Sequence, residues 1–185
     1  MTKLVIFKYI VIYIYMISQI SRKIKNRNKP KDVFITPVGL AKLHIKMTEK
    51  YSEDNVLWLD PFKNSGVYYN NFDTDKKDWC EILDGRDFFK YDTSHNNITI
   101  CSNPPYSIID KLLKKSIELK PYVISYLLKF HNITTKRLEF MEKNGYNVVY
   151  FHLTKVYDWY GMSSIIIFQK TDKPSIIKYD RKVWK

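Results

Sequence analysis

The chain has 185 residues, enough for one domain with a sizeable core and too few for two full domains. Hydrophobic residues make up 45% and charged residues 27%, a balance that excludes an intrinsically disordered chain. The formal net charge of +12 favours a polyanionic partner, either nucleic acid or an anionic membrane surface. An A/T-rich genome is the alternative source of the charge, because the chain is rich in Lys, Asn, Ile and Tyr.

The N-terminal segment differs from the rest of the chain. Residues 4–20 form an almost continuous apolar run interrupted by Lys8, and a basic stretch follows as far as Lys31. Three interpretations stay open: a short membrane anchor with a basic cytoplasmic flank, a signal peptide, or an extension that packs on the domain or reflects a start assigned too early. We therefore divide the chain into a hydrophobic segment plus basic linker, residues 1–31, and a main domain, residues 32–185.

From residue 32 onward, helical and strand patterns alternate. The first expected helix covers residues 36–51, with Thr36 as its N-cap and Pro37 in the first helical position. Two further helices are expected over residues 107–119 and 134–143. Strands are expected over seven segments, residues 56–59, 79–83, 87–89, 98–101, 123–128, 148–153 and 163–169.

This alternation predicts an α/β fold with a mainly parallel sheet of seven strands and helices on both faces. The last two strands have no clear helix between them, which predicts an antiparallel strand at the end. Cys80 and Cys101 each lie in an apolar run and lack metal-ligand spacing. We therefore expect buried, reduced thiols, no metal site and an intracellular location.

The segment Asn103-Pro104-Pro105-Tyr106 directly follows an expected strand and precedes an expected helix. A proline-rich turn would explain the prolines but not Asn and Tyr in this order. As a catalytic motif, the Asn103 side-chain oxygen and the Pro104 carbonyl accept hydrogen bonds from one NH2 group, which suits positive charge developing on its nitrogen. The prolines fix the backbone, and the Tyr106 ring offers a face for a planar group. The motif predicts methyl transfer to a planar nitrogen.

A tight loop follows the first expected strand, at the edge of the sheet where doubly wound proteins bind ligands. It comprises Asp60, Pro61, Phe62 and the residues up to Gly66, where a glycine lets the backbone approach a ligand closely. Asn64 lies within it and can adopt a positive φ at modest cost.

Two later acidic positions complete a candidate pocket. Glu81 can accept hydrogen bonds from both hydroxyls of a ribose, and Asp87 with Phe88 offers an acceptor beside an aromatic wall. Taken alone, each of these acids also fits a helix cap or a solvated turn.

Through these motifs the chain resembles the class I methyltransferases with an NPPY motif, chiefly the adenine-specific DNA methyltransferases of bacteria, phages and large DNA viruses. The resemblance covers about residues 33–170. It implies a Rossmann-like fold, S-adenosylmethionine as cofactor and methylation of adenine N6, with residues 103–106 as the catalytic motif. It also implies cofactor contacts from Thr36 and Pro37 to the methionine part, from the loop of residues 60–66, from Glu81 to the ribose, and from Asp87 and Phe88 to the adenine.

The chain departs from this family in two ways. Asn64 stands where the family has the first loop glycine, and no separate target-recognition domain is visible. Recognition would then come from residues 129–135 and 154–161, in which Trp159 and Tyr160 could stack on a base or form a packed turn, or from a partner subunit. We expect nucleic acid as the partner, DNA before RNA, and membrane association through residues 4–20 stays an alternative. RNA adenine, a protein glutamine amide, or a non-catalytic binding module are the competing functions.

Overall fold

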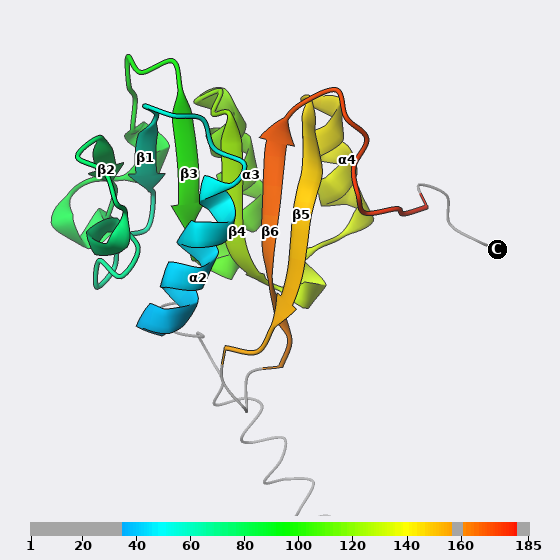
Figure 1. The fold of residues 1–185 in the computed structure, drawn as a ribbon, viewed down its shortest axis with the longest axis horizontal. Coiled ribbons are helices and arrows are strands. Elements are labelled where there is room, and N and C mark those ends of the chain that lie inside the picture. Colours follow the sequence, from blue (N-terminus) through cyan, green and yellow to red (C-terminus); the bar gives the residue numbers. More distant parts are fainter. Residues whose placement is uncertain (1–34, 157–160, 181–185) are drawn as a thin grey trace, which may run out of the picture. The chain divides into compact units, whose positions relative to one another are not determined.

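The computed structural model describes residues 35–156 and 161–180 (Figure 1). The chain divides into two units, Met1–Asp32 and Val33–Lys185, and all described residues belong to the second unit. Its centre is a six-stranded sheet with the strand order β2-β1-β3-β4-β6-β5. In chain order the elements are α2 (Val38–Glu49), β1 (Leu57–Asp60), β2 (Lys77–Trp79), β3 (Ile98–Ser102), α3 (Ile109–Glu118), β4 (Val123–Lys129), α4 (Thr135–Lys143), β5 (Tyr146–Thr154) and β6 (Ser163–Lys170).

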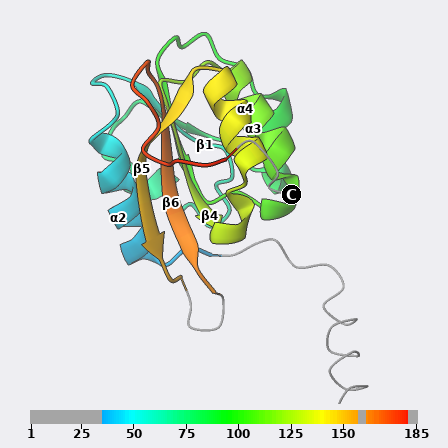
Figure 2. The same ribbon diagram turned by 90° about the vertical axis from the view of Figure 1, so that its right-hand side faces the viewer.

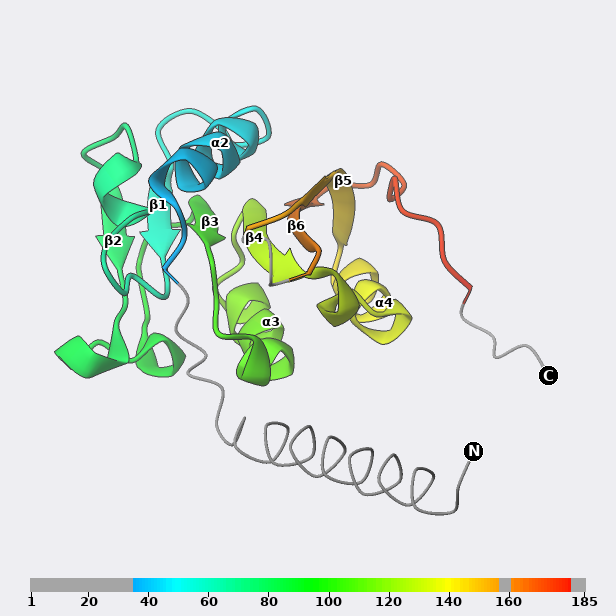
Figure 3. The same cartoon turned by 90° about the horizontal axis from the view of Figure 1, so that it is seen from below.

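The pairing pattern confirms a mainly parallel sheet with an antiparallel last strand. β1 pairs in parallel with β2 and β3, and β3 pairs in parallel with β4. β6 runs antiparallel to both β4 and β5. Figures 2 and 3 show α2 on one face of the sheet and α3 and α4 on the other, which confirms the predicted helices on both faces.

The predicted number of seven strands is wrong for the described residues, because residues 87–89 do not form a strand. Asp87 instead precedes a short 3-10 helix, Phe88–Lys90, and its Oδ1 accepts a hydrogen bond from the Phe89 backbone N–H at 3.0 Å. Such a local side-chain bond gives the backbone an alternative to strand pairing. The strand expected at residues 79–83 also ends earlier, at Trp79, and residues 82–84 form another 3-10 turn.

The start of the first helix differs from the prediction in one consequential detail. Pro37, rather than Thr36, occupies the N-cap position of α2, and no side chain caps this helix. Thr36 is 2% exposed, and its hydroxyl accepts a hydrogen bond from the side-chain amide of Asn103. α4, by contrast, has a side-chain cap, since Thr134 accepts a hydrogen bond from the Arg137 N–H.

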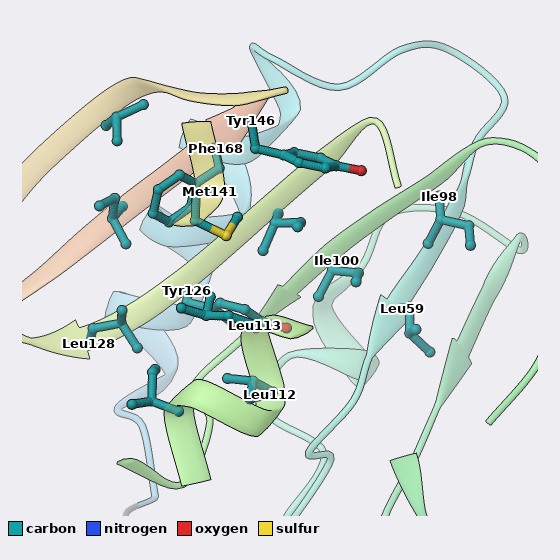
Figure 4. Close-up of a cluster of buried hydrophobic side chains, with 14 of the residues drawn as sticks. Leu59, Ile98, Ile100, Leu112, Leu113, Tyr126, Leu128, Met141, Tyr146 and Phe168 are labelled. Carbon is teal, nitrogen blue, oxygen red and sulfur yellow. The ribbon is translucent and has the colours of Figure 1, made fainter. Parts of the chain in front are cut away.

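The core lies between the sheet and α3 and α4, where Leu59, Ile100, Leu112, Tyr126 and Met141 pack together (Figure 4). Every residue of β1 and β3 is buried, as expected for parallel strands covered on both faces.

Cys80 and Cys101 are buried and free, which confirms the predicted burial of both thiols. Among the described residues, no helix has the length and apolar character needed to cross a bilayer. The apolar run of residues 4–20 lies outside the described part of the chain.

Candidate active site

The loop after β1 is pinned to the end of β2 by three hydrogen bonds. The Cys80 N–H donates to the Asp60 carbonyl at 2.9 Å, and the Lys63 N–H donates to the Cys80 carbonyl at 2.9 Å. The Asn64 N–H donates to Glu81 Oε2 at 2.9 Å. The loop of residues 60–66 therefore lies beside Glu81, the acid predicted to bind a ribose, at the carboxyl edge of the sheet.

Asn64 has a positive φ of 45°, which confirms that the asparagine takes the conformation for which glycine is usual. Gly66 also has a positive φ, 82°, a conformation that glycine adopts without strain. A Cβ at Gly66 would lie 2.8 Å from Nδ2 of the Asn70 side chain, so a larger residue would also require that side chain to move. The close approach of a ligand at Gly66 stays a prediction.

Asp60 faces the protein interior. Its Oδ1 accepts hydrogen bonds from Ser102 Oγ at 2.6 Å and from the Phe62 N–H at 3.3 Å, and the residue is fully buried. Burial raises the pKa of the Asp60 carboxyl to about 6, although the bond from Ser102 lowers it. Asp60 therefore links the end of β1 to the end of β3, and Pro61 beside it is buried as well.

Aromatic packing connects this loop to Phe88, which was predicted to contact the adenine of the cofactor. The Phe62 ring meets the buried Phe88 ring edge-on, with 5.5 Å between the centroids. Two exposed side chains that the sequence analysis did not single out, Ile82 and Leu83, are 70% and 89% exposed next to Glu81. In the sequence they form an apolar pair directly after Glu81, and this pair led to the prediction of a strand over residues 79–83. They give the Glu81 region an apolar surface that solvent reaches.

The predicted catalytic motif begins where β3 ends. Asn103 Nδ2 donates a hydrogen bond to Thr36 Oγ1 at 3.0 Å, and the Tyr106 hydroxyl donates to Asn103 Oδ1 at 3.0 Å. Pro105 precedes the 3-10 turn Tyr106–Ile108, which leads into α3. Thr36 and Asn103 are 67 residues apart in sequence, so the fold brings two predicted site residues into direct contact.

A small cavity joins the loop to the motif. Its lining includes Thr36, Phe62, Asn64, Tyr68 and Asn103. Four of these five had been singled out from the sequence, whereas Tyr68 had not. The predicted Pro37 is exposed at the start of α2.

Lys129, at the end of β4, adds a positive charge next to the motif, because its Nζ lies 5.9 Å from the centroid of the Tyr106 ring. This distance allows a cation–π interaction. Lys129 belongs to the loop region that the sequence analysis assigned to target recognition. Trp159 and Tyr160, from the other predicted recognition loop, lie outside the described residues.

The described part of the site brings hydrogen-bond acceptors together with aromatic rings. Within residues 35–156 and 161–180, no group of three or more His, Cys, Asp or Glu side chains could hold a metal ion. The same ranges contain 20 basic and 17 acidic residues, a net charge of only +3. Most of the formal charge of +12 therefore belongs to the terminal segments.

No protein-family model and no curated protein matches the chain. Among solved structures, it is similar to the METTL16 methyltransferase domain, with 14% identity, a TM-score of 0.48, and 78% of this chain and 73% of that chain covered. It is similar to magnesium protoporphyrin IX methyltransferase (ChlM) from Synechocystis PCC 6803 with bound SAM, with 8% identity, a TM-score of 0.48, and coverage of 72% and 78%. M. jannaschii TYW2 in complex with AdoMet matches with 11% identity, a TM-score of 0.43, and coverage of 74% and 77%.

Proposed function

We propose that the chain is an S-adenosylmethionine-dependent N-methyltransferase that acts on adenine N6 in nucleic acid, with DNA as the first expectation. The observation that carries the proposal is the setting of Asn103. Its amide is anchored through Nδ2 to Thr36, while Oδ1 lies on the side of Tyr106, directly after a buried parallel strand. An acceptor held in this way needs little reorganisation when charge develops on a target nitrogen.

The residues around the loop fit a nucleoside cofactor. The Glu81 carboxylate is partly exposed and accepts one backbone N–H on each oxygen, from Asn64 and from Leu83, which holds it in place and leaves acceptor capacity for a ribose diol. Asp87 is partly exposed at the next turn and can accept from an exocyclic amine. S-adenosylmethionine, when bound, supplies a methyl group already activated by its sulfonium.

The chain's own part in the reaction is to orient the target. Asn103 Oδ1 and the Pro104 carbonyl accept the two hydrogens of the target NH2 group and direct its lone pair toward the methyl donor. The Tyr106 ring provides the stacking face for the base. The Tyr106 hydroxyl bonds Asn103 Oδ1 at 3.0 Å, so it shares this oxygen with the target or gives it up when the target binds. An amide oxygen does not remove a proton, and the proton lost from nitrogen passes to water.

The choice of nucleic acid rests on charge. The terminal segments carry most of the excess of Lys and Arg, and phosphate contacts by such residues bind DNA and RNA largely without regard to sequence. In duplex DNA the target base must first leave the stack. A glutamine side chain in a protein substrate would offer Asn103 an NH2 group as well. Such a substrate would not explain the excess of Lys and Arg in the terminal segments.

Mass spectrometry of nucleosides tests the proposal. The full-length protein would be incubated with isotope-labelled S-adenosylmethionine and, separately, with DNA and RNA. Labelled N6-methyldeoxyadenosine from DNA is the expected product. Labelled N6-methyladenosine from RNA, with no labelled product from DNA, would show that the substrate is RNA. Label found only in the protein fraction would favour a glutamine amide as the methylated group. No labelled product, together with no heat of binding for millimolar cofactor, would overturn the enzyme assignment in favour of a binding module.

A further inference from the structure

A chain of buried polar side chains lies between α2 and the sheet. His44 on α2 is fully buried, as is Ser125 on β4, and Tyr68 is 2% exposed. His44 Nδ1 and the Tyr68 hydroxyl lie 2.9 Å apart, and His44 Nε2 and Ser125 Oγ lie 2.7 Å apart. Both ring nitrogens of His44 are thus used in hydrogen bonds that join three separate elements.

This polar chain reaches the catalytic motif through Thr36. Burial raises the pKa of the Tyr68 hydroxyl well above its ordinary value, and a side-chain hydrogen bond with Thr36 lowers it in part, as expected when the threonine donates to the phenol oxygen. Thr36 Oγ1 in turn accepts from Asn103 Nδ2 at 3.0 Å. Thr36, Tyr68 and Asn103 also line the same cavity.

The proton order along the polar chain follows from the chemistry of its members. Burial lowers the pKa of His44 to about 3, so its imidazole is neutral and has one donor and one acceptor. A phenol is a better hydrogen-bond donor than an aliphatic hydroxyl. Tyr68 therefore donates to Nδ1, and the Nε2–H donates to Ser125. The Tyr68 oxygen then accepts from Thr36, whose own oxygen accepts from Asn103.

The opposite order would have a chemical consequence at the motif. With the proton of His44 on Nδ1, Tyr68 would donate to Thr36, and the Thr36 proton would be free for the side-chain oxygen of Asn103. The amide of Asn103 could then rotate by half a turn and present its NH2 group to a target that is itself an NH2 donor. Two donors facing each other cannot bond, so the orientation of this amide decides whether the motif can bind its target.

We propose that His44 and Tyr68 are positioning residues that fix the side-chain amide of Asn103, with Nδ2 toward Thr36 and Oδ1 toward the target nitrogen. The catalytic consequence rests on the proposed function, whereas the orientation of the amide does not. Neither residue touches the target, and both act through Thr36.

The first test compares Tyr68→Phe with the matched control Tyr126→Phe. Tyr126 is equally buried, and its hydroxyl shares a 2.7 Å hydrogen bond with Ser116 on α3. Each variant loses one buried hydroxyl. Tyr68→Phe is expected to lower kcat about 10- to 100-fold with the Kd for S-adenosylmethionine unchanged, because misplacement of the acceptor affects the chemical step. Tyr126→Phe is expected to keep kcat close to wild type. Equal effects of the two variants on kcat would contradict the positioning role.

The second test needs no activity. Nitrogen-15 NMR reports both the tautomer of His44 and the side-chain NH2 signals of Asn103. We expect a neutral His44 protonated at Nε2 from roughly pH 5 to 8, and Asn103 signals that shift in Tyr68→Phe but not in Tyr126→Phe. A proton on Nδ1, or Asn103 signals that ignore Tyr68→Phe, would overturn the proposal. Thr36→Val replaces Tyr68→Phe if that variant does not fold, with the same expectation. A wild type that responds in this way yet transfers no methyl group would refute the proposed function and leave the positioning role intact.

Discussion

Replacement of Asp60 by Asn should remove part of the pH dependence of the free energy of unfolding. Burial raises the pKa of this carboxyl from an ordinary 3.8 to about 6, so the folded protein binds this proton more tightly than the unfolded chain does. The stability associated with a protonated Asp60 is fully present below about pH 4 and is lost as the pH rises through about 6. A shift of this size corresponds to about 3 kcal/mol in the free energy of unfolding.

Urea unfolding of wild type and Asp60→Asn between about pH 4 and 7 would measure this effect. The free energy of unfolding of wild type should fall relative to the variant by up to about 3 kcal/mol across this range. The amide still accepts hydrogen bonds from Ser102 and the Phe62 N–H, so the comparison isolates the charge. Asp110→Asn is the control with the opposite sign, because a hydrogen bond from Arg137 lowers the pKa of Asp110. Parallel curves for wild type and Asp60→Asn would refute the assignment of a desolvated carboxylate.

Three further predictions concern binding and catalysis. Glu81→Gln should weaken S-adenosylmethionine binding by about tenfold or more in calorimetry, because a hydrogen bond to a charged acceptor contributes about 1.5–3 kcal/mol; an unchanged Kd would remove Glu81 from the ribose site. Tyr106→Phe should keep most activity, since the ring remains, whereas Tyr106→Ala should weaken binding of the target base by about 1–3 kcal/mol in KM or Kd; equal losses in both variants would show that the hydroxyl, not the ring, matters. Removal of residues 1–31 should flatten the salt dependence of DNA binding, because it removes eight Lys and Arg; an unchanged slope would place the phosphate contacts on the domain.

Continuous apolar runs made much of the sheet predictable. β1, β3 and β4 are buried along almost their whole length, and their sequences show this directly. The error at residues 87–89 arose because the two aromatic residues after Asp87 resemble a strand, while the Asp87 side chain closes a turn on the Phe89 N–H. Burial pattern alone cannot reveal such a local cap.

The candidate site could be predicted where its residues directly follow a strand. It could not be predicted where hydrogen bonds join residues that are far apart in the sequence. The motif from Asn103 to Tyr106 and the loop containing Asn64 follow strands, so their edge of the sheet could be inferred. The contact between Thr36 and Asn103 could not, because a threonine before a helix also fits an N-cap. The hydrogen bonds of His44 reach partners 24 and 81 residues away, and no spacing rule connects such positions.

The most direct test of the central claim is methyl transfer by Asn103→Ala, measured with labelled S-adenosylmethionine and DNA alongside calorimetric titration of the cofactor. In the proposed function, Asn103 supplies the acceptor for the target nitrogen and is not assigned to the cofactor. The account predicts a loss of transfer of about 100-fold or more with the cofactor Kd close to that of wild type. Transfer near the wild-type rate by a folded Asn103→Ala variant would contradict the account.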